Sequence, residues 1–134
     1  MESPHDSAPL SGFRILVVED AFLPAEDLAR ELSDLGCMVL GPEGYVETAL
    51  KRIEGAELDG ALLDVNLHDK PCFEIASALS SRHIPFIFLT GYDQDEVFPA
   101  EFRASPRLGK PIDYRKMQRM ISEHFSRRSL GSRI

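Results

Sequence analysis

The chain has 134 residues, of which 43% are hydrophobic and 28% charged, a size and balance typical of one folded domain with a single core. This composition excludes the disordered and fibrous classes of protein. Because residues 1–102 carry a net charge of −14 and only residues 103–134 are basic, at +7, nucleic-acid binding by the whole domain is disfavoured.

The first twelve residues predict a loose leader. They lack the basic start and the continuous apolar stretch of a secretory signal. Apolar runs elsewhere, such as 84–89, are far shorter than the roughly 20 residues that span a bilayer. We therefore expect a flexible leader at 1–12, one domain at 13–126, a polar tail at 127–134, a cytoplasmic location and no membrane anchor.

Strands and helices alternate along the first half of the chain. The β-branched run after Gly12 predicts a strand buried on both faces, and leucines at helical spacing before Gly36 predict a helix. In chain order we expect a strand at 14–18, a helix at 24–35, a strand at 38–40 closed by Gly41-Pro42, and a helix from Val46 to near Gly55.

The second half continues the alternation, with one weak segment. Between 92 and 106 prolines interrupt the pattern, so the fourth helix should be short or mobile. Five strands alternating with helices predict an α/β fold, a doubly wound five-stranded parallel sheet with helices on both faces. The remaining elements are expected as strands at 61–64, 85–90 and 107–110, a helix around 75–79, and a final amphipathic helix through Met117 and Phe125.

Polar residues stand where the predicted strands end. Glu19 and Asp20 follow the first strand, Asp64 ends the third, Thr90 the fourth and Lys110 the fifth. The carboxyl ends of parallel strands meet at one edge of the sheet, where ligands bind in such folds. Three carboxylates brought together there repel one another unless a divalent cation neutralises them. An all-oxygen ligand set favours Mg²⁺, with Mn²⁺ as a substitute.

The same residues suit phosphoryl transfer. A carboxylate beside Mg²⁺ can attack phosphorus as a nucleophile, while an ammonium and a hydroxyl contact the transferring oxygens. Asp64, Lys110 and Thr90 fill these roles. Each residue alone has a simpler explanation as a helix cap or a solvated side chain, and only the set of successive strand ends indicates a site.

Four segments are specific as a set through their order and spacing. They are Ile15-Leu-Val-Val-Glu-Asp20, Leu62-Leu-Asp-Val-Asn-Leu67, Phe88-Leu-Thr-Gly-Tyr92 and Gly109-Lys-Pro111. Over residues 13 to 126 the chain resembles the receiver domains of two-component response regulators, the flavodoxin-like (βα)5 family that includes the chemotaxis regulator CheY. By that resemblance Glu19 and Asp20 form an acidic metal pair, Asp64 is phosphoacceptor and metal ligand, and the main-chain carbonyl of Asn66 is a further metal ligand.

The resemblance also covers the phosphoryl group's surroundings. Thr90 and Lys110 would contact that group, and the small Gly91 would leave space for it. Family members commonly have a cis peptide bond at the position of Lys110-Pro111. Tyr92 would either shield the acyl phosphate from water or pack on the fourth helix, and both interpretations stay open.

The motif sequences are closer to one branch of the family, and they depart from the family pattern at two places. Members of the branch carry Phe-Ala-Thr-Gly after the fourth strand and are often paired with HWE-type or related histidine kinases, and this chain has Phe88-Leu-Thr-Gly91. Arg107 stands where an aromatic switch residue is usual, and Pro71-Cys-Phe73 where many receivers have a glycine. Activation is therefore expected to order or shift residues 92–106.

These features predict a stand-alone response regulator that accepts a phosphoryl group from a histidine kinase on Asp64. It would signal through contacts with a phosphotransfer or downstream regulatory protein, catalyse its own phosphorylation and dephosphorylation, and not be an enzyme with a separate substrate. Interaction without phosphorylation and a phosphate sink for a shared kinase stay open. An aspartyl phosphatase is disfavoured because Asn66 cannot act as a general acid, and a flavin or nucleotide carrier because no glycine-rich phosphate loop follows the first strand.

Overall fold

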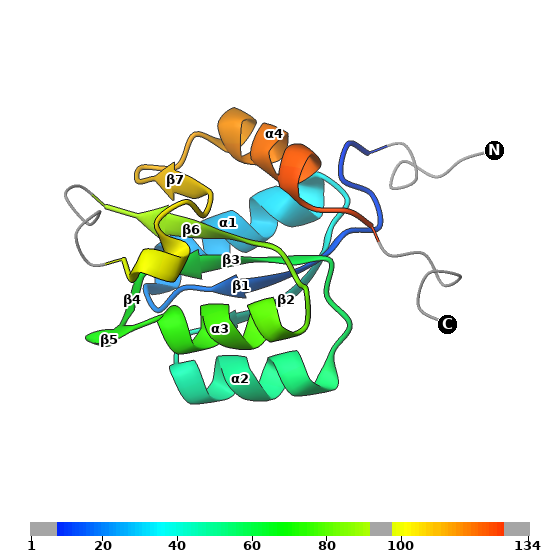
Figure 1. Cartoon of the computed structure of the whole chain (residues 1–134). Helices are drawn as coiled ribbons and strands as arrows, with labels where there is room; N and C mark the ends of the chain where they lie inside the picture. The colour runs from blue at the N-terminus through cyan, green and yellow to red at the C-terminus, as the bar shows by residue number, and fades with distance from the viewer. Residues whose placement is uncertain (1–7, 92–97, 128–134) are drawn as a thin grey trace.

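The computed structural model describes residues 8–91 and 98–127, which form a parallel sheet covered by helices on both faces (Figure 1). The strand order β2-β1-β3-β6-β7 confirms the predicted doubly wound five-stranded fold. The strands of this sheet are β1 (Arg14–Val18), β2 (Met38–Glu43), β3 (Gly60–Asp64), β6 (Phe86–Thr90) and β7 (Arg107–Gly109). The α-helices of the described residues are α1 (Phe22–Asp34), α2 (Val46–Gly55), α3 (Phe73–Ser81) and α4 (Tyr114–His124).

The apolar side chains of the sheet supply two cores, one on each face. Figure 1 shows α1 and α4 on one face and α2 and α3 on the other. The central strand β3 contributes to both cores, because successive side chains of a strand point to opposite faces. Leu63 packs in the core with α2 and α3, and Leu62 packs in the core with α1 and α4. Since every residue of β3 is buried, its sequence is a continuous apolar run that becomes polar only at its last residue, Asp64.

Strand β2 is longer than the sequence predicts. It continues to Glu43 through Gly41-Pro42, where an end is expected, and the bond between these two residues is cis. Gly41 makes this course feasible, because its φ is +92° and a Cβ there would lie 2.7 Å from the main-chain oxygen of Val17. The signals that usually end a strand here permit a close approach between β2 and β1 instead.

A short antiparallel hairpin follows β3, and the sequence does not predict it. Strand β4 (Asn66–Leu67) pairs with β5 (Lys70–Pro71). The two residues of its turn, His68 and Asp69, have φ values of +47° and +66°, in the left-handed region that side chains usually avoid. The turn contains no glycine, so the residue types that usually indicate such a turn did not predict it.

The fourth helix is predicted to be short or mobile, and the structure describes only part of the connection between β6 and β7 that would hold it. The described part contains one turn of 3-10 helix, η2 (Ala100–Phe102), where a complete (βα)5 fold would have its fourth α-helix. Residues 92–97 lie outside the described residues, and Tyr92 is among them. Phe98 and Phe102 are buried and anchor the described part on the α3 face of the sheet.

The two ends of the described chain meet at one edge of the sheet. Leu10 is completely buried, and its N–H donates to the main-chain oxygen of Leu35 at 2.8 Å, so residues 8–12 pack on the domain where the sequence predicts a loose leader. Arg127 donates from Nη1 to the main-chain oxygen of Ser11 at 3.0 Å. Figure 1 shows both ends of the described chain on the side of the sheet opposite the carboxyl ends of β1 and β3. Within the described ranges, no helix is both long and apolar enough to cross a membrane.

Candidate functional site

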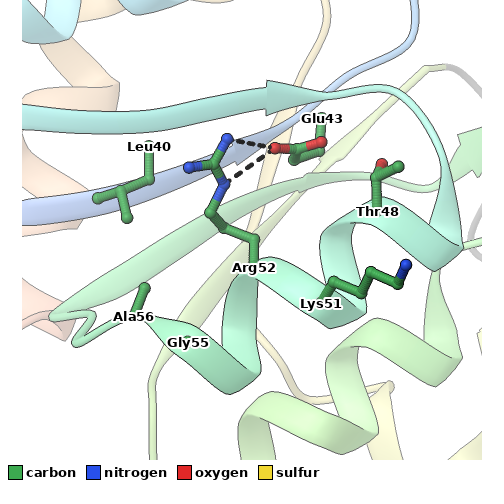
Figure 2. Close-up of a pocket in the computed structure, with 7 residues that line it drawn as sticks. All are labelled: Leu40, Glu43, Thr48, Lys51, Arg52, Gly55 and Ala56. Atoms are coloured by element: carbon green, nitrogen blue, oxygen red, sulfur yellow. Dashed lines mark hydrogen bonds and ion pairs between the residues drawn. The ribbon is translucent and has the colours of Figure 1, made fainter.

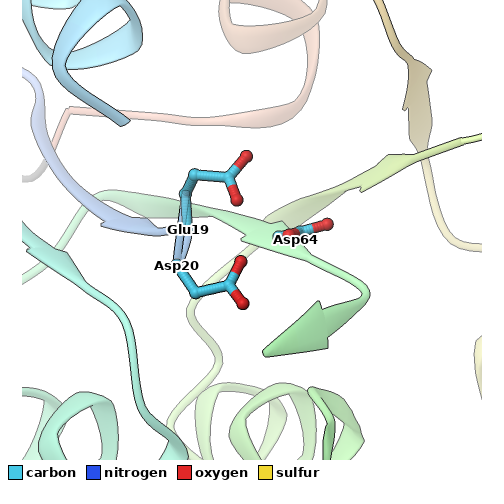
Figure 3. Close-up of side chains that lie close together, drawn as sticks. All are labelled: Glu19, Asp20 and Asp64. Atoms are coloured by element: carbon cyan, nitrogen blue, oxygen red, sulfur yellow. The ribbon is translucent and has the colours of Figure 1, made fainter. Parts of the chain in front are cut away.

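Three carboxylates meet at the carboxyl edge of the sheet. Glu19 and Asp20 follow β1 directly, and Asp64 is the last residue of the adjacent β3. One oxygen from each lies within 4.8 Å of the others, and Figure 3 shows the three side chains gathered at the strand ends. Glu19 is only 4% exposed and Asp64 9%, whereas Asp20 is partly open to solvent. The strand-end positions alone therefore bring the predicted acidic residues together.

Lys110, the residue directly after β7, extends its side chain to this acidic cluster. Its Nζ donates to Glu19 Oε1 at 3.0 Å and to Asp64 Oδ1 at 3.1 Å. Its main-chain N–H donates to the main-chain oxygen of Thr90 at 2.7 Å, which ties the end of β7 to the end of β6. The peptide bond between Lys110 and Pro111 is cis, as the sequence comparison with receivers implies. All five residues predicted at strand ends thus stand at one edge of the sheet.

Burial and the crowding of negative charge shift the pKa values of the cluster. Burial, together with the hydrogen bond and charge of Glu19, raises the pKa of Asp64 to about 7, although the ammonium of Lys110 opposes this shift. Burial works to lower the pKa of Lys110, but Glu19 and Asp64 raise it above its usual value. One ammonium faces three carboxylates, so a divalent cation fits the charge and the all-oxygen chemistry of the cluster.

The remaining predicted residues surround the cluster less tightly. Asn66 begins β4, two residues after Asp64, and is exposed. Gly91 follows Thr90 and is also exposed, while Thr90 is half-buried. The expected role of Tyr92 falls outside the described residues. The structure therefore places Asn66, Thr90 and Gly91 at the same edge as the carboxylates, beside a surface that is partly open.

Arg107, at the position of the usual aromatic switch, packs on an aromatic ring. Its guanidinium carbon lies 3.8 Å from the centre of the Phe98 ring, and its Nη2 donates to the main-chain oxygen of Arg103 at 2.8 Å. Arg103 in turn donates from Nε to the main-chain oxygen of Phe98 at 3.3 Å. The segment before β7 is thus held to β7 by Arg107, where an aromatic residue is usual at that position.

Sequence reasoning missed one residue at the cluster. His68, in the turn of the β4–β5 hairpin, donates from its main-chain N–H to Asp20 Oδ2 at 2.8 Å. Burial works to raise the pKa of Asp20, yet this hydrogen bond and others hold it below its usual value. No pattern in the sequence could find this contact, because it depends on a left-handed turn that contains no glycine.

A hollow of about 520 Å³ lies between β2 and α2, away from the three carboxylates (Figure 2). Arg52 crosses it and donates to Glu43 Oε2 from Nε at 3.0 Å and from Nη2 at 2.8 Å. These two charged groups satisfy each other, so the hollow offers little to a polar ligand. The chemistry of the chain is concentrated at the acidic cluster.

Known proteins with this arrangement were found by comparison of structure. SdrG from Sphingomonas melonis Fr1 is 36% identical in sequence, with a TM-score of 0.73, covering 82% of this chain and 93% of that one. The signal receiver domain of a modulated diguanylate cyclase from Desulfovibrio desulfuricans G20 is 32% identical, with a TM-score of 0.73, covering 82% and 90%. The chain belongs to the receiver-domain family of response regulators.

Comparisons with family models, curated relatives and a more distant structure give weaker similarities. No family model matches it. The matching curated relatives include sensory transduction and response regulatory proteins at 28% or 29% identity, and the receiver spans about half of their length. The receiver domain of sensor histidine kinase PA1611 from Pseudomonas aeruginosa PAO1 has a magnesium ion coordinated in its active site cleft. It is 23% identical, covers 84% of this receiver and 97% of that chain with a TM-score of 0.74, and so shares the fold.

Proposed function

We propose that this receiver accepts a phosphoryl group on Asp64 from a histidine kinase of a two-component system, with Mg²⁺ bound beside it. The observation that carries the proposal is the position of Lys110 Nζ, within 3.1 Å of both Glu19 and Asp64 at the edge where three carboxylates meet. A half-buried lysine paired with two buried acids contributes little net stability, because desolvation of the charges offsets their attraction. The same group is well placed to bind a transferring phosphoryl oxygen.

The proposed transfer is a displacement at phosphorus. An oxygen of Asp64 bonds to phosphorus while the phosphorus–nitrogen bond of a donor phosphohistidine breaks. The departing imidazole nitrogen keeps the electron pair and takes a proton from solvent. Lys110 donates hydrogen bonds to the phosphoryl oxygens, and the hydroxyl of Thr90 does the same from the end of β6. Hydrolysis of the acyl phosphate, catalysed within the same site, would return Asp64 to its free form.

The proposed metal site consists of oxygen atoms at the ends of two strands. Glu19, Asp20 and Asp64 would hold Mg²⁺ through carboxylate oxygens, with the main-chain carbonyl of Asn66 as a further ligand. When bound, the cation supplies positive charge to the phosphoryl oxygens and neutralises the carboxylates. Mn²⁺ would substitute because it accepts the same oxygen ligands. The magnesium of the PA1611 receiver supports this assignment through likeness of fold.

The finer parts of the proposal concern partners. The segment Phe88-Leu-Thr-Gly91 resembles the Phe-Ala-Thr-Gly branch, so we propose a kinase of the HWE type or a related one. Output would pass through contact with a phosphotransfer or downstream regulatory protein in the cytoplasm. The proposed receiver unit is 13–126, extended at its start by the buried Leu10.

The direct test is intact mass after incubation with Mg²⁺ and acetyl phosphate. One phosphoryl adduct is expected in the wild type, absent with EDTA and in Asp64→Asn, and reduced in Lys110→Ala. Asp69→Asn is a matched control, because it removes an exposed carboxylate from the nearby hairpin, and asparagine tolerates its left-handed backbone. An adduct that persists in Asp64→Asn would refute the assignment of the phosphoacceptor. No adduct in the wild type, even with candidate kinases, would favour a module that interacts without phosphorylation.

A further inference from the structure

Two residues beside the acidic cluster are unusual for their local structure. Tyr45 is the N-cap of α2, with φ −130° and ψ 148°, and its side chain makes no capping hydrogen bond. Serine, threonine, aspartate or asparagine would satisfy a free N–H of the helix at that position. His68 has a φ of +47°, in the left-handed region that few residues with a side chain adopt, although histidine adopts it more often than most. Tyr45 is therefore a poor helix cap, and His68 holds an uncommon backbone conformation.

The two side chains contact each other. Their rings are stacked, with centroids 4.3 Å apart and planes 14° from parallel. The stack is largely at the surface, since Tyr45 remains 54% exposed. An exposed ring pair adds little to a hydrophobic core, so its value lies in what it holds in place. It joins the first residues of α2 to the turn of the β4–β5 hairpin.

The hairpin turn is in contact with the acidic cluster. The main-chain N–H of His68 donates to Asp20 Oδ2 at 2.8 Å, so the position of the turn fixes the orientation of this carboxylate. Asn66 begins the same hairpin, two residues before His68. A second contact supports the arrangement, because Lys70 Nζ lies 3.0 Å from Glu47 Oε1 across the hairpin and α2. Both residues of that ion pair are well exposed, so it contributes little by itself.

A hollow of about 400 Å³ adjoins the stack. It is lined by residues that include Glu19, Asp20, Tyr45 and His68. The stacked rings thus form part of the wall of this hollow, and Glu19 and Asp20 form another part of the same wall. Movement of the hairpin would change both the wall and the hydrogen bond to Asp20.

We propose that the Tyr45–His68 stack positions Asp20 and the start of the hairpin for the divalent cation, which makes Tyr45 a positioning residue for metal binding. The inference rests on the proposed function, because it assigns these two residues to the same Mg²⁺ site. Groups that orient metal ligands through hydrogen bonds contribute to metal affinity although they do not touch the ion. Here the ring of Tyr45 contacts the ring of His68, and His68 contacts the ligand Asp20 through its main-chain N–H, with its Nδ1 3.9 Å from the same carboxylate oxygen.

The test is the dissociation constant for Mg²⁺, measured by isothermal titration calorimetry on the full chain. Tyr45→Ala is expected to weaken binding roughly 2- to 10-fold, the range that a stacked aromatic pair contributes to an equilibrium constant. Tyr45→Phe keeps the ring and should bind as the wild type does. Met38→Ala is the control, because it removes another exposed apolar side chain, 62% exposed, from the opposite end of β2.

A second variant separates positioning from a general loss of structure. His68→Gly removes the ring, relieves the left-handed strain and keeps the N–H that bonds Asp20. It is expected to weaken Mg²⁺ binding as Tyr45→Ala does, and the double variant should bind no more weakly than either single variant. Urea denaturation without metal should give unfolding midpoints of Tyr45→Ala and Tyr45→Phe close to that of the wild type.

The outcomes distinguish the inference from the function on which it rests. A wild type that binds Mg²⁺ together with a Tyr45→Ala variant of equal affinity would overturn the positioning role alone. Additive losses in the double variant would also overturn it, since the rings would then act separately. A wild type with no Mg²⁺ binding would overturn the proposed metal site and the positioning role together.

Discussion

Replacing Asp64 with asparagine should stabilise the chain, and by an amount that grows with pH. In the absence of metal the pKa of Asp64 is raised to about 7, from a usual value of 3.8, chiefly by burial and then by Glu19. A carboxyl whose pKa is higher in the folded state stabilises that state most at low pH. This contribution is lost as pH rises from about 4 towards 7, because the folded state must then release a proton into an unfavourable environment. Asparagine has no proton to release.

The size of the effect follows from the width of that window. Between pH 5 and pH 7 the unfolded chain has lost the proton, while the folded chain releases it only as the pH nears 7. The wild type therefore loses roughly 2 kcal/mol of unfolding free energy through this group between pH 5 and pH 7, because the folded carboxyl is about half ionised at pH 7. Asp64→Asn should escape this loss, so its advantage over the wild type should widen by roughly 2–3 kcal/mol between pH 5 and pH 7.5.

The assay is urea denaturation in EDTA at pH 5 and at pH 7.5, with the unfolding free energies of the variant and the wild type compared at each pH. Asp69→Asn, which removes an exposed carboxylate nearby, is the control for a general change of charge. An advantage that stays constant between the two pH values, or a variant less stable than the wild type at pH 7.5, would refute the reasoning. Either result would mean that the cluster relieves its crowding by another route.

Three further perturbations test other parts of the structure. Gly60→Ala should destabilise the fold by about 1–3 kcal/mol in urea denaturation, because its Cβ would overlap the ring of Phe125. Gly109→Ala, whose Cβ would meet no described atom within 4 Å, should be near neutral, and equal losses in the two variants would contradict the packing argument. Arg107→Ala should cost about 1 kcal/mol of unfolding free energy through loss of its contact with Phe98, with a smaller cost for Arg107→Lys; no loss in the alanine variant would count against that contact. Mg²⁺ at 100 times its dissociation constant should stabilise the wild type by about 2.7 kcal/mol at pH 8, measured by thermal unfolding against an EDTA sample, and an unchanged midpoint would argue against the metal site.

The parts of the site that the sequence predicts are those placed by strand ends. A buried parallel strand reads as an apolar run, so the first polar residue after it, such as Asp64 after β3, marks the carboxyl edge of the sheet. Because the strands are parallel, their carboxyl ends share one edge, so Glu19 and Lys110 arrive at the same place without knowledge of the strand order. This is why the fold and the acidic cluster could both be predicted.

The parts that could not be predicted depend on backbone conformations with no sequence signature. The β4–β5 hairpin turns through two left-handed residues, His68 and Asp69, in place of the expected glycine or asparagine. Gly41-Pro42 suggests a stop, yet the glycine lets β2 continue alongside β1 as far as Glu43. Leu10 stands in a mostly polar leader with no periodic apolar neighbours, so only the structure shows that it is buried in the core with α1 and α4.

The neighbouring ends of the described chain have a practical consequence. Ser11 and Arg127 are joined by a hydrogen bond at the edge of the sheet opposite the acidic cluster. A fluorescent label, an affinity tag or a surface tether attached next to Ser11 or Arg127 would therefore lie away from the acidic cluster. The same proximity makes the chain suitable for circular permutation, with a short linker between the old ends and new ends at an exposed loop.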